Sequence, residues 1–99
     1  MLPPWQEQFL FAQTPAIDSL LLLLQKDKED TNKVIHLYSL CSGYSNIGVY
    51  DTALYYGNAG LQLAQQLNFQ KGITASYNNI GNIYYNQGNY PEALKNYLN

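Results

Sequence analysis

The sequence holds very few of the residues from which catalytic and metal sites are usually built. Its 99 residues include one cysteine, one histidine and no arginine, and charged residues make up only 12%, about half of the usual share. A single cysteine excludes an internal disulfide framework and a cysteine-rich zinc site, and a single histidine excludes a histidine metal cluster. Five lysines against seven acids give a formal net charge of −2, which argues against nucleic acid as a partner. Because 46% of the residues are hydrophobic, we expect one small folded domain.

No residue pattern in the chain points to catalysis. His36 has no acid at a useful helical spacing, and Cys41 falls on an apolar stripe where a small buried residue is expected. The acids near residue 28 alternate with lysines, which is typical of a solvated loop. The glycines lack the strand, turn and lysine of a phosphate-binding loop. We therefore predict no enzyme activity, no cofactor and no metal.

The first thirteen residues are expected to be a disordered tail or the remnant of a signal peptide. The segment 9–13 resembles the end of a signal, but no basic residue precedes Lys26 and the apolar run is short. A signal would favour the periplasm of a bacterium, whereas the free Cys41 would favour the cytoplasm, so the compartment stays open. The chain also has no apolar run long enough to cross a bilayer.

A first helix is predicted over residues 15–28. Thr14 is a good N-cap, and Pro15 suits the first helical position because its missing N–H is not needed there. Five consecutive leucines, Leu20, Leu21, Leu22, Leu23 and Leu24, point to all sides of such a helix. Two interpretations follow. Either this is a core helix with some leucines at the surface, or it packs on something outside the chain, such as a second copy.

The chain repeats itself at a shift of forty residues. The matched pairs are Leu40 with Ile80, Tyr44 with Tyr84, Asn46 with Asn86, Gly48 with Gly88, Tyr50 with Tyr90, Ala53 with Ala93 and Leu54 with Leu94. Apolar residues at helical spacing predict further helices at 32–47, 51–67, 70–87 and 91–99. Gly48 and Gly88 suit left-handed helix ends. Asp51 is expected to cap the following helix, and Pro91 to open the last one.

The predicted helix 51–67 carries small residues on one face. Ala53, Gly57, Gly60 and Ala64 share that face, and each mid-helix glycine costs about 1 kcal/mol in helix propensity. We expect close helix packing to offset this cost, with a tyrosine (Tyr44, Tyr77 or Tyr84) seated in the notch.

These features resemble the tetratricopeptide repeat (TPR) family. The second unit carries Tyr77, Ile80, Gly81, Tyr84, Gly88, Tyr90, Ala93 and Tyr97 at the places of the family's signature. The first unit departs from it at Cys41, Gly57 and Gly60, and Tyr56 is expected to fill the space of the missing aromatic residue. The period of forty exceeds the common 34, and we expect the extra length at residues 67–72, in both helices and in their link. This longer form resembles repeats of bacterial signalling proteins.

The resemblance implies an all-α fold, a right-handed α-solenoid of antiparallel helix pairs with about five helices. It implies a capping helix at 14–30, a first repeat at 31–69, and a second repeat at 70–99 that is truncated in its second helix. Its implied function is a protein–protein interaction module, the N-terminal sensory or partner-binding region of a bacterial signal-transduction protein.

The resemblance also places the first helix of each pair on a concave face that binds a peptide or protein. The candidate residues there are Tyr38, Ser42, Asn46, Asn78, Asn79, Asn82, Tyr85 and Asn86. This set contains no lysine or arginine, which argues against recognition of a carboxylate or phosphate. The alternative is that these asparagines fasten neighbouring helices to each other.

A second functional hypothesis is a self-association scaffold. Solenoids usually need about three repeats for stability, and this chain shows two. We therefore expect either a longer protein or a dimer, formed through the leucine run or by domain swapping.

Overall fold

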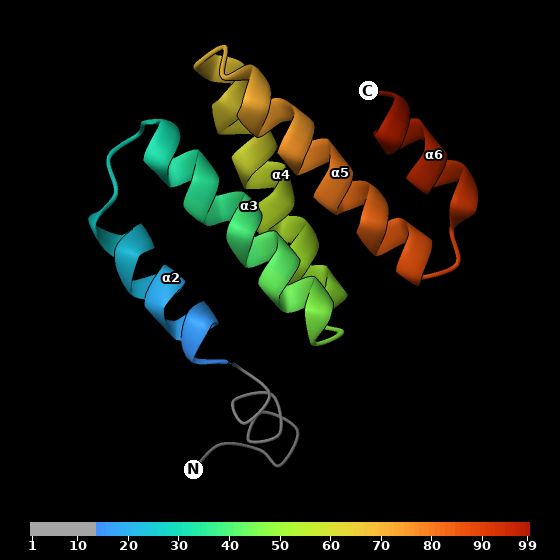
Figure 1. Cartoon of the computed structure of the whole chain (residues 1–99), viewed down its shortest axis with the longest axis horizontal. Coiled ribbons are helices and arrows are strands. Elements are labelled where there is room, and N and C mark those ends of the chain that lie inside the picture. Colours follow the sequence, from blue (N-terminus) through green and yellow to red (C-terminus); the bar gives the residue numbers. More distant parts are fainter. Residues whose placement is uncertain (1–13) are drawn as a thin grey trace.

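The computed structural model describes residues 14–99, which form five α-helices and no strand (Figure 1). The helices are α2 (Pro15–Lys26), α3 (Thr31–Asn46), α4 (Tyr50–Gln66), α5 (Gln70–Asn86) and α6 (Tyr90–Leu98). The all-α prediction is confirmed, and the predicted helix ends differ from the observed ones by at most two residues. The expectation for residues 1–13 lies outside the described residues.

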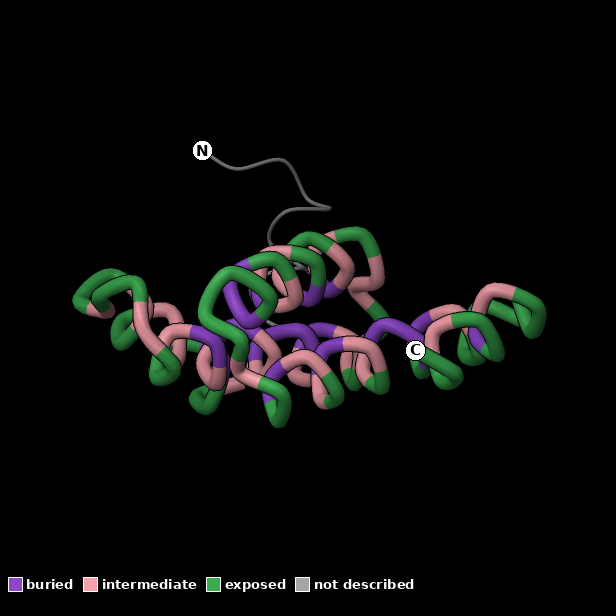
Figure 2. Tube along the Cα trace, turned by 90° about the horizontal axis from the view of Figure 1, so that it is seen from above, coloured by how far each residue is buried: buried purple, intermediate pink, exposed green. Residues whose placement is uncertain are grey.

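Successive helices run in opposite directions and form a flat molecule of 43 × 35 × 17 Å. α3 and α5 run side by side in the same direction, and α4 packs against both (Figure 1). α2 packs on the outer side of α3, and α6 on the outer side of α5. The buried positions gather along the middle of the molecule, with exposed residues around its rim (Figure 2).

Three turns of the same kind connect the last four helices. In each turn the N–H of the left-handed residue bonds to the carbonyl three residues back, and the next N–H bonds to the carbonyl five residues back. This pair of bonds is the Schellman motif. The left-handed residues are Gly48 (φ 78°), Asn68 (φ 53°) and Gly88 (φ 79°), which are twenty residues apart. The link at residues 67–69 is therefore no longer than the other two, so the expectation of a longer link was wrong, and the extra length of the repeat lies in its helices.

The turn at Gly88 provides a test of this backbone requirement. We expect Gly88→Ala to lower the free energy of unfolding by about 1 kcal/mol, because a left-handed conformation strains a residue with a Cβ. A Cβ at this position would meet no atom within 4 Å, so packing does not contribute. Gly88→Asn should cost less, since Asn68 already occupies the equivalent position. Urea denaturation of the three proteins checks whether the free energy of unfolding decreases from Gly to Asn to Ala at this position. Equal stability of all three would contradict the prediction.

Side-chain caps begin three of the helices. The Thr14 hydroxyl accepts a hydrogen bond from the N–H of Ile17, and Pro15 occupies the first turn, as predicted. Asp30 caps α3 and Asn89 caps α6 in the same way, and Pro91 lies in the first turn of α6. The prediction for Asp51 was wrong in detail: α4 begins one residue earlier, so this carboxylate lies inside the first turn, and no side chain caps the helix.

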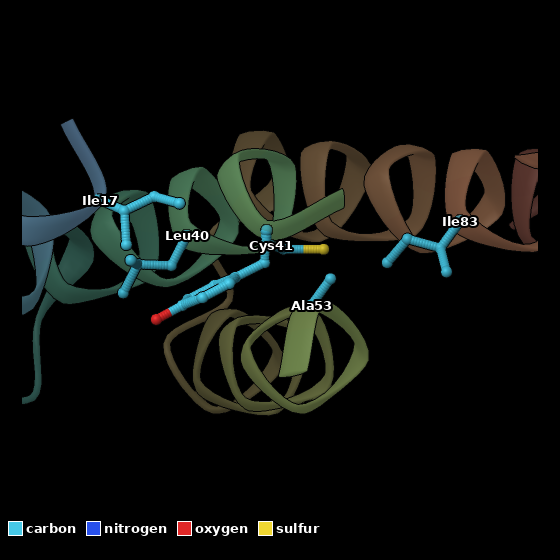
Figure 3. Packing of buried hydrophobic residues seen from close by; sticks show 6 residues of the cluster. Ile17, Leu40, Cys41, Ala53 and Ile83 are labelled. Atoms are coloured by element: carbon cyan, nitrogen blue, oxygen red, sulfur yellow. The ribbon is translucent and has the colours of Figure 1, made fainter. Parts of the chain in front are cut away.

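The largest core cluster joins all four helices from α2 to α5. Its buried members are Ile17, Leu40, Cys41, Tyr44, Ala53 and Ile83, most of which are labelled in Figure 3. Around it pack Leu20, Leu21 and Leu24, whereas Leu22 and Leu23 are 63% and 47% exposed. α2 is thus a core helix with two leucines at the surface.

The small residues of α4 allow it to approach α3 and α5 closely. A Cβ at Gly57 would lie 2.8 Å from Cys41 Sγ and 2.9 Å from Ile80 Cγ1, and a Cβ at Gly60 would lie 3.2 Å from Leu37 Cβ. The nearest side chains at these glycines are therefore small or aliphatic, so the expected tyrosine does not lie against them, although Tyr44 belongs to the same buried cluster as Ala53. Tyr56 instead packs at the core and stacks on Tyr44 with ring centroids 5.7 Å apart, which fits the predicted substitution for the missing aromatic residue.

Ser76 is buried at this same interface, and its hydroxyl has no hydrogen-bond partner among residues 14–99. We expect Ser76→Ala to raise the free energy of unfolding by about 1 kcal/mol, because an unpaired buried hydroxyl carries a desolvation cost and alanine also has the higher helix propensity. Thermal unfolding checks this prediction, with Ser19→Ala on the exposed side of α2 as control. A lower melting temperature for Ser76→Ala would contradict it.

Candidate functional site

A shallow polar groove lies between α3 and α5. Its volume is about 180 Å³, and it is lined by Ser42, Ser45, Asn46, Asn79, Asn82 and Asn86. Five of the eight candidate residues predicted from the sequence therefore line one groove. They come together because α3 and α5 run parallel, so that equivalent turns of the two helices face each other.

Two of the asparagines also connect helices. Asn79 Nδ2 donates to the backbone carbonyl of Tyr38 at 2.9 Å, which ties α5 to α3. Asn82 Oδ1 accepts from the Tyr97 hydroxyl at 2.5 Å, which ties α5 to α6. The alternative that asparagines fasten neighbouring helices is therefore correct for these two.

The other four groove residues keep their side-chain polar groups available. Ser42, Ser45, Asn46 and Asn86 form no side-chain hydrogen bond with any described residue. An amide offers two donor hydrogens and an acceptor oxygen, and a hydroxyl offers both functions as well. The groove can therefore form hydrogen bonds of either kind with a bound molecule.

Three candidate residues lie outside the groove lining. Tyr38 contributes its backbone carbonyl through the bond to Asn79. Asn78 is exposed on α5. Tyr85 is 57% exposed and packs edge-on against Tyr90, with ring centroids 5.3 Å apart. Tyr38 and Asn78 lie one helical turn before Ser42 and Asn82, and Tyr85 directly precedes Asn86, so these three residues flank the groove lining without forming part of it.

A second hollow, of about 370 Å³, was not predicted. It is lined by Leu24, Glu29, Lys33, Leu37, Tyr55, Tyr56, Ala59, Gln62, Leu63 and Gln66. Its floor includes the buried Leu37 and Leu63, and Tyr55 at its border is 69% exposed. Lys33 forms an ion pair with Glu29 there. No single-helix pattern reveals this hollow, because α2, the following loop, α3 and α4 all contribute to it.

The loop after α2 holds a hydrogen-bond partner for His36. The Nδ1 atom of His36 lies 2.5 Å from Asp27 Oδ2, and the side chains are only 20% and 12% exposed. The expectation of a solvated loop was therefore wrong for Asp27. The sequence argument missed this pair because the acid comes from the loop rather than from the same helix.

The single thiol is a core group, as predicted. Cys41 is fully buried, and burial raises the pKa of its thiol from 9.0 to about 12. A thiol with such a pKa is a poor nucleophile at neutral pH. Within residues 14–99, no three histidine, cysteine or acidic side chains gather as a metal site would need. In the same part of the chain, none of the helices has the length and apolar character that crossing a membrane requires.

Comparison with known proteins yields one family. The family model described as "SusR N-terminal TPR domain" matches residues 6–98. No curated protein and no solved structure matches the chain.

Proposed function

The chain belongs to the family of the SusR N-terminal TPR domain, and from this premise we propose that it binds an extended segment of a partner protein in the groove between α3 and α5. Tetratricopeptide repeats form protein–protein interaction modules, and repeat proteins of this type bind on extended concave surfaces. The observation that carries the proposal is the lining of the groove by six neutral side chains that donate and accept hydrogen bonds.

The chemistry of the groove suits a peptide backbone. An extended backbone presents a carbonyl acceptor and an N–H donor in every residue, and the amides of Asn46 and Asn86 can satisfy both. No charged side chain lines the groove, so it lacks the lysine or arginine that a carboxylate or phosphate would require.

We place this module at the N-terminal, partner-binding or sensory end of a bacterial signal-transduction protein. Support comes from the description of the matching family, which is that of an N-terminal domain, and from the resemblance of the forty-residue repeat to those of bacterial signalling proteins. The chain would then act through its partner rather than by catalysis, with no cofactor.

If the groove binds a partner, replacing different asparagines should have different effects. Asn86→Ala should weaken partner binding about two- to tenfold, the loss expected for one or two hydrogen bonds, and leave the melting temperature unchanged. Asn79→Ala should lower the melting temperature, because it removes the bond between α5 and Tyr38. Asn58→Ala, an exposed position on α4, is the matched control.

The experiment combines peptide binding with thermal melting of these three variants. Peptides selected from a random library on the wild-type protein serve as ligands, and amide chemical shifts show where they bind. Shifts confined to residues outside α3 and α5 would contradict the groove. Melting temperatures that fall equally for Asn86→Ala and Asn79→Ala would assign a purely structural role to both.

A second candidate function is a self-association scaffold. It is favoured by exposed leucines on the two outer helices, Leu22 and Leu23 on α2 and Leu94 and Leu98 on α6. Light scattering over a range of protein concentrations tests this function without any partner. A mass that rises with concentration, and that returns to the monomer value in a Leu22→Ser, Leu23→Ser variant, would support it, whereas a monomer throughout would exclude it.

A further inference from the structure

The hollow of about 370 Å³ that is lined by α2, α3 and α4 differs in character from the polar groove. Six of its ten lining residues are leucine, tyrosine or alanine, and its floor includes the buried Leu37 and Leu63. α2 and α4 both pack on α3, whereas the described backbones of α2 and α4 make no contact with each other. The hollow is the space left between these two helices, and we call it the apolar hollow.

Tyr55 presents a large aromatic surface at one end of the apolar hollow, near the start of α4. Its side chain is 69% exposed and packs edge-on against Tyr56, with ring centroids 5.2 Å apart. The other end is polar, because Gln66 at the end of α4 and the ion pair of Lys33 with Glu29 lie there. An exposed aromatic ring beside an apolar depression is typical of a surface that another apolar group covers.

The aromatic end of the apolar hollow lies at the edge of the molecule where residue 13 joins the described chain. α2 begins at this edge, and α4 begins there as well, after the turn at Gly48 (Figure 1). From Thr14, the hollow extends along α2 to Leu24, a distance of about 15 Å for ten helical residues. Thirteen residues can span up to about 45 Å. The segment 1–13 is therefore long enough to follow the hollow to either end.

The composition of the segment 1–13 matches the apolar hollow. It has one charged side chain, that of Glu7, and its large apolar residues are Met1, Leu2, Trp5, Phe9, Leu10 and Phe11. Moving such side chains out of water and against Tyr55 and the leucine floor is favourable. The family match begins at residue 6, so the second half of this segment belongs to the domain that the family shares.

We propose that the apolar hollow is the docking site of this chain's own segment 1–13, and that Trp5 is among the side chains buried there. The covalent link favours this occupant, because a short tether gives an effective concentration in the millimolar range. A second copy or a separate partner at a lower concentration would have to displace it. The inference goes beyond the proposed function and does not depend on it, since no residue lines both the hollow and the groove.

The fluorescence of Trp5 tests the proposal, because it is the only tryptophan among the 99 residues. The whole chain is compared with a free peptide of residues 1–13, in which the indole is in water. We expect the emission of the whole chain to lie at a shorter wavelength, with weaker quenching by acrylamide. Both values should be unchanged by about a hundredfold dilution, because docking within one chain does not depend on concentration.

Variants of α4 locate the docking site. Ala59→Glu places a charge in the apolar hollow and should move the emission to that of the free peptide, whereas Asn58→Glu on the exposed side of α4 should not. Tyr55→Ser removes an exposed ring from the hollow and should act in the same direction as Ala59→Glu. Its matched control is Tyr85→Ser, which removes a ring that is 57% exposed on α5. Circular dichroism verifies that each variant keeps its helices.

Methyl signals provide a second, independent readout of the same site. Trp5→Ser should shift the methyl signals of Leu24, Leu37 and Leu63, because an indole ring changes the magnetic field at groups that it contacts. Shifts confined to residues outside the apolar hollow would overturn the proposal. It would also be overturned by emission equal to that of the free peptide, or by emission that neither Ala59→Glu nor Tyr55→Ser changes. Emission that reaches the free-peptide value on dilution would assign the hollow to the segment of a second copy instead.

Discussion

Replacing Leu40 with alanine is expected to lower the free energy of unfolding by about 2–5 kcal/mol. Leu40 is fully buried in the cluster that joins α2, α3, α4 and α5 (Figure 3). Removing three carbon atoms from it loses the hydrophobic transfer energy and leaves a cavity that neighbouring side chains fill only in part. Since small domains are stable by about 5–15 kcal/mol in total, the variant should be close to unfolding at room temperature. Urea denaturation followed by circular dichroism measures the change.

Leu22→Ala is the matched control for this prediction. It removes the same atoms from α2, but Leu22 is 63% exposed, so the expected change is within about 0.5 kcal/mol. Similar losses in the two variants would show that the cluster around Leu40 does not dominate stability, or that Leu22 is covered in solution. A concentration-dependent loss in Leu22→Ala would identify the second case, which is the self-association candidate.

Raising the pH above 9 is expected to destabilise the protein through Cys41. The pKa of its thiol is raised from 9.0 to about 12 by burial. Between these values the unfolded chain has lost the thiol proton while the folded chain keeps it, so each pH unit favours unfolding by about 1.4 kcal/mol. The stabilisation is thus complete below pH 9 and is lost as the pH rises toward 12, by roughly 3–4 kcal/mol. Tyr44 and Tyr56 act in the same direction above pH 10, because burial raises their pKa values as well.

The measurement is the free energy of unfolding between neutral and alkaline pH, in the presence of a reductant. Cys41→Ala is the control, because it removes the thiol and leaves both tyrosines. Its stability should fall less between pH 9 and pH 10, where the thiol of the unfolded chain is mostly ionised and the tyrosines, with an ordinary pKa of about 10, are at most half ionised. Parallel profiles for the wild type and the variant would contradict the prediction.

The groove shows why a single residue type can have two roles in this protein. Asn79 and Asn82 use part of their amides to hold α3, α5 and α6 together, whereas Asn46 and Asn86 at the open end have no such bond among the described residues. The inner asparagines fix the spacing of the two helices. The outer ones are available to a ligand at that fixed spacing, which favours binding because the two helices need not move to form the site.

The sequence by itself determined the helices and their repetition. Helix ends depend on local chemistry, such as the Thr14 cap and the left-handed Gly48 and Gly88. These signals can be recognised in the sequence because they do not depend on tertiary contacts. The match at a shift of forty residues identified the repeat. The resemblance to the TPR family supplied the concave face, and five of the eight candidates chosen on it line the groove. The link around residue 68 was predicted, but the left-handed conformation of Asn68 was not, because asparagine signals it less strongly than glycine does.

Only the tertiary structure decided which side chains meet across helices. The pairing of His36 with Asp27, the bond from Asn79 to Tyr38, and the contact of Gly57 with Cys41 and Ile80 each join different segments of the chain. Such contacts depend on how far one helix is shifted and rotated relative to the next, and the spacing within one helix does not contain that information. The same holds for the three acids in the first turns of α2, α4 and α6. Asp18, Asp51 and Glu92 are far apart in the sequence, and they share one edge because the chain reverses direction after every helix.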